Sequence, residues 1–278
     1  MKKVLFILQK KHYTSQLMSY IKTLKLIGYE IHIFTDMEDE FEYCDKQQKC
    51  NFNILRLENY TRKIKDYYMV LCNSKMIEII IKLVNIKEKD RIIYINSKIN
   101  INKGGENNYC IENYIKEGKY IFCSIGEFNK NNNQIMQLEA MIRIIKRYPQ
   151  AKLLLVGQGK LKEYYEHIIE KFELNENVEI IENAISKIDI VQKANCIIST
   201  RKKEEFALDS LIAIILNKPI LAFDIGINKY ILKKENIFYN SENLKDKMKK
   251  YIEENRNFER YYDISLKERE KILESNII

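Results

Sequence analysis

The residues with the clearest chemical potential form a charged turn at residues 201–205, with the sequence Arg-Lys-Lys-Glu-Glu. A short apolar run precedes this turn, and residues 206–216 after it are apolar nearly all round, which predicts a buried helix. Asn217-Lys218-Pro219 ends that helix because proline cannot continue it, and residues 220–223 then read as a buried strand. In an open α/β sheet, a charged turn between a strand and a helix lies where ligands bind. The start of the helix also offers backbone N–H groups to an anion.

Other candidate positions each have a functional and a purely structural interpretation. Gly157 and Gly159 form a tight turn after an apolar strand, which a strand-to-helix connection needs with or without a ligand. Lys130 lies in an asparagine-rich loop, where it is either a phosphate ligand or a solvated lysine. His12 lies in the first loop, either as a general base with a pKa near neutrality or as an ordinary surface histidine. The two glutamates of the charged turn also fit a solvated helix start favoured by the helix dipole.

The elements that must position these residues alternate regularly between strands and helices. Strands are predicted at residues 4–8, 31–35, 52–57, 68–72, 91–96, 120–125, 151–156, 178–181, 196–199 and 220–223. Helices are predicted at residues 15–27, 75–84, 134–147, 161–172, 188–193, 206–216, 242–254 and 265–276, and residues 36–50 are predicted to be a loop. This alternation predicts an α/β protein with parallel, doubly wound sheets.

The length of 278 residues suits two domains better than one. A linker is predicted at residues 97–118, where Gly104-Gly105 and several asparagines interrupt any periodicity. We therefore expect two Rossmann-like domains that face a cleft, at residues 1–115 and 116–278.

Composition excludes several classes of function. The net charge of +8 is spread along the chain without a nucleic-acid-binding motif, so we expect no nucleic-acid partner and at most a weak attraction to anionic membranes. Six cysteines without a CxxC pair and only three histidines make a zinc site improbable. The first apolar run is too short for a signal peptide, and no run is long enough to span a bilayer. These features are typical of a cytoplasmic protein, and the absence of G-x-G-x-x-G in the first turn argues against a dehydrogenase.

The charged turn and the strands before it resemble the donor-site segment of retaining GT-B glycosyltransferases of the family-4 type. Positions that match that pattern are Glu204, Phe206, Ala213, Pro219 and Ala222. Further landmarks are Gly126, the turn at residues 153–159, Asn177-Val178 and the early segment Gly28–Thr35. The resemblance covers residues 1–35 and 66–275 and is strongest over 120–224. Several elements that the family has between Leu57 and Tyr68 are missing, so the resemblance implies a reduced N-terminal, acceptor-side domain, with the last helix crossing back onto it.

What the resemblance implies is transfer of a sugar, with retention, from a nucleotide-sugar donor to a glycan, lipid or protein acceptor. No metal or other cofactor is required in that family. Glu204 would contact the sugar, and His12 is the second candidate for a catalytic role. Donor-binding positions are Gly126, Lys130, Gly157, Gly159, Glu204, Phe206, Ala207 and Asp209, with Lys130 and the amides near Phe206 holding the diphosphate.

The same resemblance also shows departures from the family's pattern. Glu127 and Asn132 stand where the family has an arginine and a lysine that neutralise the diphosphate, and Glu205 replaces a glycine. Ile212 replaces the second glutamate, which contacts the ribose, so Asp209, one turn earlier, is our candidate for that contact. Losing two charge-assisted hydrogen bonds removes about 3–6 kcal/mol of binding free energy. The alternative function is therefore a catalytically inactive glycosyltransferase-like subunit that binds or stabilises a protein partner.

Overall fold

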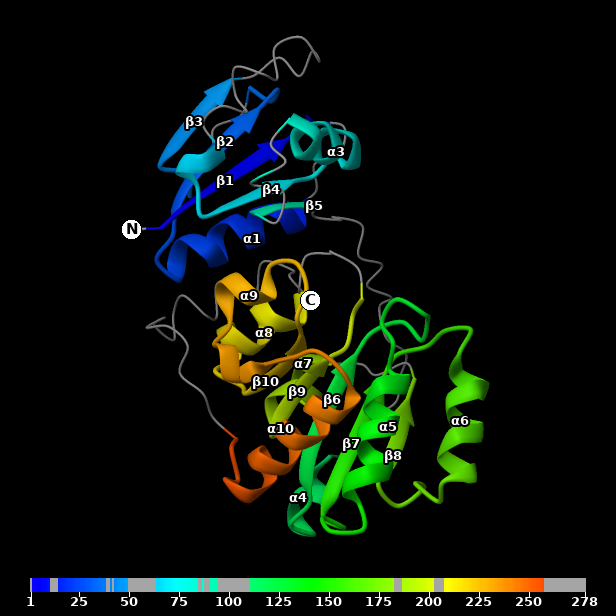
Figure 1. Ribbon diagram of the computed structural model, residues 1–278. Coiled ribbons are helices and arrows are strands. Elements are labelled where there is room, and N and C mark those ends of the chain that lie inside the picture. The colour runs from blue at the N-terminus through cyan, green and yellow to red at the C-terminus, as the bar shows by residue number, and fades with distance from the viewer. Residues whose placement is uncertain are drawn as a thin grey trace. The chain divides into compact units, whose positions relative to one another are not determined.

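A computed structural model describes residues 2–10, 15–38, 41, 43–49, 64–84, 87, 91–94, 111–182, 187–202 and 208–257. These residues divide into two compact units, one within residues 1–100 and one within residues 101–261. Each unit contains a parallel sheet flanked by helices (Figure 1). The prediction of two Rossmann-like α/β domains is therefore confirmed, whereas the domain boundary at residues 115 and 116 stays a prediction.

The first unit is built on a parallel sheet with the strand order β3-β2-β1-β4-β5. Its strands are β1 (Lys3–Leu8), β2 (Glu30–Thr35), β3 (Lys46–Lys49), β4 (Met69–Cys72) and β5 (Ile92–Tyr94). Its helices are α1 (Ser15–Leu26) and α3 (Lys75–Val84), with a short 3-10 helix η2 (Ile64–Asp66). The apolar runs of β1 and β4 are buried along almost their whole length, which is why they form the centre of the sheet.

Side chains alternate between the two faces of this sheet. One core contains Leu5, Ile7 and Val70 with Ile77 and Ile81 of α3. Helix α1 ends where the sequence predicts, because Gly28 adopts a left-handed φ of 93° and the N–H of Tyr29 bonds the carbonyl of Leu24 at 3.1 Å.

Two predictions for the first unit need comment. The prediction of a loop over residues 36–50 is wrong at residues 46–49, because β3 pairs there with β2 in parallel register from His32–Lys46 to Thr35–Lys49. Its sequence, Lys-Gln-Gln-Lys, has no apolar residue to mark it, and it lies outermost in the described strand order. The strand predicted at residues 52–57 lies outside the described residues.

The second unit is a parallel sheet with the order β11-β10-β9-β6-β7-β8. Its strands are β6 (Tyr120–Ile125), β7 (Ala151–Val156), β8 (Val178–Ile181), β9 (Cys196–Ser199), β10 (Ile220–Phe223) and β11 (Ile237–Phe238). Within this sheet the chain starts at β6, continues outward through β7 and β8, and returns to the other side of β6 at β9. The strand order therefore reverses between β6 and β9, and this topological switch point is where doubly wound sheets bind ligands.

Helices cover both faces of the second sheet. They are α4 (Glu112–Lys116), α5 (Ile135–Ile144), α6 (Lys162–Lys171), α7 (Lys187–Lys193), α8 (Leu208–Leu216), α9 (Asn228–Ile231) and α10 (Ser241–Glu253), with a 3-10 helix η4 (Lys234–Asn236). Phe122, Leu153 and Leu155 of the sheet share a core with α5, α6 and α10, and α10 lies in front of the sheet in Figure 1. The intervening side chains of the strands, such as Ile121 and Cys123, point to the opposite face.

Helix α8 ends at the predicted stop signal. Asn217 takes a left-handed φ of 53°, and the N–H of Lys218 bonds the carbonyl of Ala213 at 2.8 Å, which satisfies a carbonyl that the helix leaves open. Pro219 then begins the path into β10. Helix α4 lies inside the predicted linker at residues 97–118, and the last predicted helix, at residues 265–276, lies outside the described residues.

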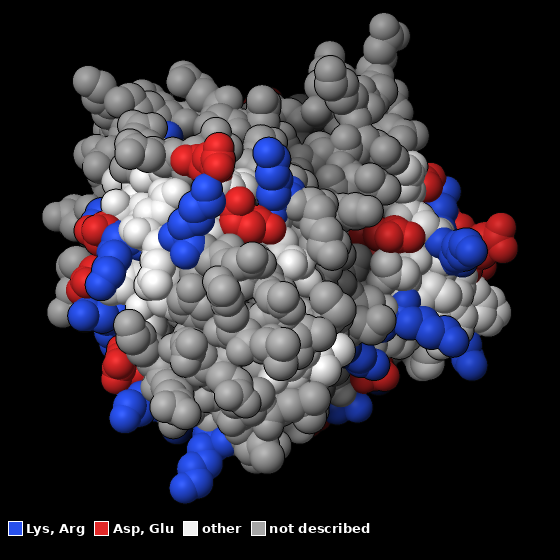
Figure 2. Space-filling view, turned by 90° about the horizontal axis from the view of Figure 1, so that it is seen from above, with Lys and Arg blue, Asp and Glu red and all other residues white. Residues whose placement is uncertain are grey.

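Charge on the face seen in Figure 2 is mixed, with Lys and Arg side chains interspersed among Asp and Glu. Among the described residues, opposite charges pair on the surface, as Lys25 does with Asp45 and Lys49 with Glu38. None of the described helices combines the length and the apolar character needed to cross a membrane.

Candidate functional site

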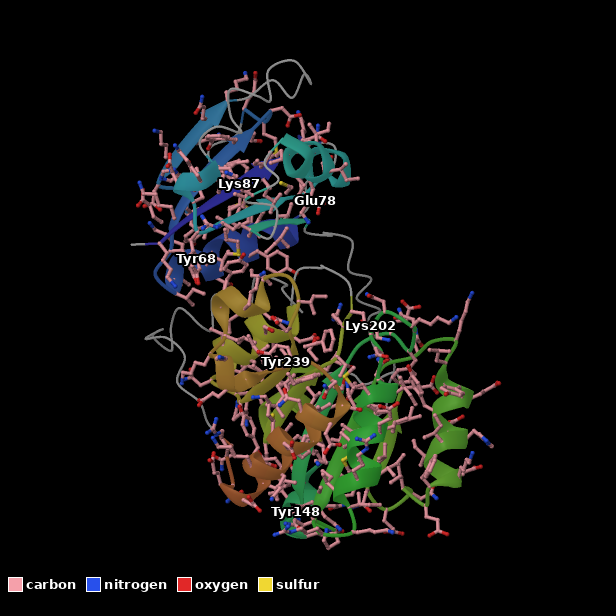
Figure 3. The ribbon with its side chains drawn as sticks, viewed as in Figure 1. Tyr68, Glu78, Lys87, Tyr148, Lys202 and Tyr239 are labelled. Carbon is pink, nitrogen blue, oxygen red and sulfur yellow. The ribbon has the colours of Figure 1, made fainter. Side chains whose placement is uncertain are left out.

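The candidate site lies at the carboxyl ends of β6, β7 and β9 in the second unit. Lys202, three residues beyond β9, lies at this end of the sheet in Figure 3, and Tyr148, which precedes β7, lies at the opposite end. Two of the predicted donor-binding segments, around Gly126 and around Gly157, are thereby brought together.

The loops after β6 and β7 are joined by their backbones. The N–H of Gly126 bonds the carbonyl of Val156 at 3.0 Å, and the N–H of Phe128 bonds the carbonyl of Gln158 at 2.9 Å. The ring of Phe128 is fully buried against Tyr165 of α6, with ring centroids 5.7 Å apart. Burial raises the pKa of Tyr165 to about 12, so its hydroxyl stays protonated and donates to Gln134 Oε1 at 3.1 Å.

Gly157 and Gly159 are required by this contact between loops. A β-carbon on Gly157 would lie 2.0 Å from the carbonyl oxygen of Gly126, and one on Gly159 would lie 2.6 Å from that of Phe128. Both glycines also have positive φ angles, 158° and 155°, which other residues rarely adopt. Their predicted contact with a donor stays a prediction, because the loop packing alone accounts for the two glycines.

Asparagine and glutamine side chains shape the loop after β6. Asn129 Oδ1 accepts the N–H groups of Asn131 and Asn132 at 3.0 and 2.9 Å, which is an Asx-type turn. Asn132 Nδ2 and Gln134 Nε2 both donate to the carbonyl of Glu127, at 2.6 and 3.1 Å. Asn132 is buried and therefore supports the loop, whereas Glu127 and Lys130 are exposed.

The loop after β9 is tied to the loop after β6. Thr200 Oγ1 donates to the carbonyl of Asn132 at 2.7 Å, and Gln137 Nε2 of α5 donates to both Thr200 Oγ1 and Ser124 Oγ, at 2.8 and 2.9 Å. The N–H of Lys202 bonds the carbonyl of Asn131 at 2.9 Å. These bonds cross the switch point and fix the two loops relative to each other.

A charged pair lies next to these bonds. The guanidinium of Arg201 contacts the carboxylate of Asp209, with Nε–Oδ2 at 3.2 Å and Nη2–Oδ1 at 3.5 Å. Ser199 Oγ donates to Asp209 Oδ2 at 2.8 Å. The Arg201 side chain is 23% exposed and that of Asp209 only 6%, so the carboxylate lies in the protein and the cation faces outward. The predicted contact between Asp209 and a ribose stays a prediction.

Several predicted site residues fall outside the described part of the chain. They are His12, Glu204, Phe206 and Ala207, together with the neighbouring Glu205. Ile212, which stands where the family has a glutamate, is buried in α8 with 4% exposure. Within the described ranges, no group of three or more His, Cys, Asp or Glu side chains could hold a metal ion.

Sequence reasoning did not place Arg201, Ser199, Thr200 or Gln137 in the site. Arg201 and Asp209 lie eight residues apart in the sequence, and no local pattern predicts that their side chains pair. One signal was available, since Ser199 and Thr200 are the polar residues that end an otherwise apolar strand, at the edge where ligands bind.

The two parallel-sheet units, with a second unit of strand order β11-β10-β9-β6-β7-β8, have the fold of GT-B glycosyltransferases. The chain belongs to the glycosyl transferases group 1 family, whose model matches residues 108–270. That range contains β6 to β11 and all the described site residues.

One curated relative agrees with this family assignment. An uncharacterized glycosyltransferase of Methanocaldococcus jannaschii is 27% identical over 110 residues, which are 40% of this chain and 27% of that protein. The chain thus matches only about a quarter of the length of this curated relative.

Solved structures share the fold at low sequence identity. TarM of S. aureus has a TM-score of 0.51 and 17% identity, over 93% of this chain and 54% of that one. HepE of Anabaena in complex with UDP has a TM-score of 0.50 and 12% identity, over 99% of both chains. The pneumococcal O-GlcNAc transferase GtfA, in complex with UDP and GlcNAc, has a TM-score of 0.50 and 13% identity, over 92% of this chain and 50% of that one.

Proposed function

We propose that this protein transfers a sugar from a nucleotide-sugar donor to a glycan, lipid or protein acceptor, with retention of configuration, as a family-4-type enzyme. The observation that carries the proposal is the coincidence of the family match at residues 108–270 with a unit whose switch point is built from joined polar loops. Polar loops at the carboxyl ends of parallel strands are where doubly wound sheets hold nucleotides.

The donor's diphosphate is the part that the switch point suits best. The nucleoside diphosphate is the leaving group of the donor and is an anion. Fixed cations and N–H dipoles therefore stabilise the negative charge that develops on it as the bond to the sugar breaks. Lys130 is exposed on the loop after β6, and α8 begins at Leu208 just after the charged turn, so both are candidates to contact the phosphates. In the proposed reaction Glu204 orients the sugar and His12 serves as a base, with no metal required.

The first unit is proposed to receive the acceptor as a reduced N-terminal domain. At its own switch point the loops after β1 and β4 are joined by Asn73, whose Oδ1 accepts the N–H of Gln9 at 2.8 Å and whose Nδ2 donates to the carbonyl of Gln9 at 3.0 Å. The net charge of +8 favours approach to an anionic membrane from the cytoplasm, where a lipid-linked acceptor would lie.

A second candidate is an inactive subunit that stabilises an active partner. It is favoured by one observation: the residue at the family's lysine position, Asn132, is buried and donates to the carbonyl of Glu127 at 2.6 Å. That side chain supports the loop and carries no charge to a phosphate.

The test is a calorimetric titration of the purified protein with UDP, GDP and ADP, each with and without an attached sugar. The proposed function predicts micromolar affinity for one of the three series, and the base identifies the donor class. Absence of binding up to millimolar concentration would contradict it and favour the inactive subunit. Any donor that binds is then incubated with the protein, and proton NMR follows the anomeric signal of the released or transferred sugar.

A further inference from the structure

The cations that the family places on the loop after β6 are absent at Glu127 and Asn132, yet a cation from another strand lies close to Gly126 at the start of that loop. Nη2 of Arg201, which follows β9, lies 3.8 Å from where a β-carbon on Gly126 would be. Gly126 and Arg201 therefore face each other across the switch point between β6 and β9. Glu127 is exposed, so its carboxylate is solvated rather than fixed at this position.

Arg201 is held in place by a buried acceptor. Asp209 accepts from Nε and Nη2 of Arg201 at 3.2 and 3.5 Å and from Ser199 Oγ at 2.8 Å. A fork of two N–H groups on one carboxylate fixes the plane of the guanidinium as well as its position. An arginine that is ordered before the ligand arrives loses little conformational freedom on binding.

The surroundings of Arg201 are polar and are joined by hydrogen bonds. Thr200 and Lys202, on either side of it, bond the carbonyls of Asn132 and Asn131 at 2.7 and 2.9 Å. Asn132 Oδ1, Asn133 Nδ2 and Gln137 Oε1 are buried without a hydrogen-bond partner, and each of these side chains belongs to a residue at least nine-tenths buried. A buried polar atom without a partner calls for an explanation, and a bound water, an ion or a functional role are the usual ones.

We propose that Arg201 binds the donor's diphosphate in this chain, with Asp209 and Ser199 as its positioning residues. This inference rests on the proposed function, since it names the residue that carries out one part of it. In this proposal the arginine takes over the role of the basic residues that the chain lacks at positions 127 and 132. In this proposal Asp209 acts through Arg201, and its predicted contact with the ribose stays a separate prediction.

The negative charge of Asp209 limits how much Arg201 can add to the affinity for a diphosphate. Asp209 cancels part of the field of Arg201, but it lies on the inner side, whereas the 23% of the Arg201 side chain that is exposed faces the solvent from which a phosphate arrives. A charge-assisted hydrogen bond of this kind corresponds to about a 10- to 100-fold change in affinity.

The experiment compares the wild-type protein with Arg201→Gln by calorimetric titration. UDP, GDP and ADP are the probes, each alongside its monophosphate, and Arg143→Gln is the matched control. Arg143 pairs with Glu242 on the surface of the same unit, and its side chain is 45% exposed, so its loss should leave binding unchanged. Thermal melting of each variant reports whether the fold is retained.

We expect Arg201→Gln to lower the affinity for the nucleoside diphosphate about 10- to 100-fold and to reduce the preference for the diphosphate over the monophosphate. If Arg201 only supported the fold, its substitution would lower the affinities for the diphosphate and for the monophosphate by the same factor. Equal diphosphate affinity in wild type and Arg201→Gln would overturn the role of Arg201 and leave the proposed function standing. If the wild type binds none of the three nucleotides or their sugar derivatives, both proposals are wrong.

A second measurement needs no variant and so survives a folding defect. Phenylglyoxal modifies accessible arginines, and mass spectrometry follows the peptides that contain Arg201 and Arg143 in the wild-type protein. We expect the bound nucleoside diphosphate to protect Arg201 and to leave Arg143 unaffected. Unchanged labelling of Arg201 at saturating nucleotide would overturn the inference.

The role of Asp209 is tested by Asp209→Asn, which keeps the volume of the side chain and removes its charge. If Asp209 positions Arg201, the variant binds the nucleoside diphosphate more weakly than wild type does, by a smaller factor than Arg201→Gln. Tighter binding would mean that Asp209 only offsets the charge of Arg201, and its positioning role would be wrong.

Discussion

At the residue scale, Gly157 is the position where a small change should disturb the site most directly. An added β-carbon would lie 2.0 Å from the carbonyl oxygen of Gly126. The substituted residue would also have to adopt the φ of 158° that Gly157 has. We expect Gly157→Ala to lower the free energy of unfolding by about 2–5 kcal/mol, from backbone strain and steric overlap together. Urea unfolding followed by circular dichroism measures this change.

Gly118→Ala is the matched control for that experiment. Gly118 also has a positive φ, 69°, but no atom lies within 4 Å of an added β-carbon. Its substitution should therefore cost only the left-handed strain, about 1–2 kcal/mol. Equal losses in the two variants would show that close packing of the loops after β6 and β7 is not what requires a glycine at 157.

Individual site residues were only partly predictable from the sequence. Gly157 and Gly159 were predicted from a tight turn after an apolar strand and Gly126 from the family resemblance, and the structure brings the three together. Arg201 was noted as part of a charged turn, but its approach to Gly126 depends on the order of β6 and β9 in the sheet. Proximity across a switch point is a property of topology, which local sequence does not encode.

At the element scale, the apolar runs were sufficient to predict nearly all the buried strands. β1, β4, β6, β7, β9 and β10 are each within a residue of their predicted range. Strands buried on both faces need continuous apolar sequence, which is easy to recognise. β3 and the two-residue β11 were not predicted because one is polar and the other is too short for any periodicity.

The ends of helices were also predictable where capping residues mark them. Gly28 and Asn217 take left-handed conformations after α1 and α8, and the side chain of Asn240 caps α10 by accepting the N–H of Asn243 at 2.8 Å. Helix α4 was missed because its five residues carry no such signal and lie beside a glycine- and asparagine-rich stretch.

Burial of the central strands leads to a prediction about thiol chemistry. Cys72 in β4 and Cys123 in β6 are buried, and burial raises the pKa of both thiols well above the ordinary range. Since the thiolate is the reactive form, neither cysteine should react with iodoacetamide at pH 8 in the native protein. Mass spectrometry of the labelled peptides checks this, with the urea-unfolded protein as the control in which both react. Rapid native labelling of either cysteine would contradict the burial of these strands.

At the scale of the whole molecule, the family and the fold were predictable from the sequence, whereas the reaction stays a proposal. Two α/β domains and the glycosyltransferase resemblance followed from the strand and helix alternation and from matches such as Gly126 and Pro219. The base of the donor, the sugar and the acceptor depend on a few side chains whose roles vary within one fold.

The central claim is that the donor binds at the carboxyl ends of β6 and β9, and hydrogen–deuterium exchange with mass spectrometry tests it most directly. The protein is compared with and without the nucleoside diphosphate that binds most tightly among UDP, GDP and ADP. We expect slower exchange in residues 126–134 and 199–210, and no change at the opposite end of the sheet in residues 145–150 and 172–177. Protection confined to that opposite end, or no protection anywhere at saturating nucleotide, would contradict the claim.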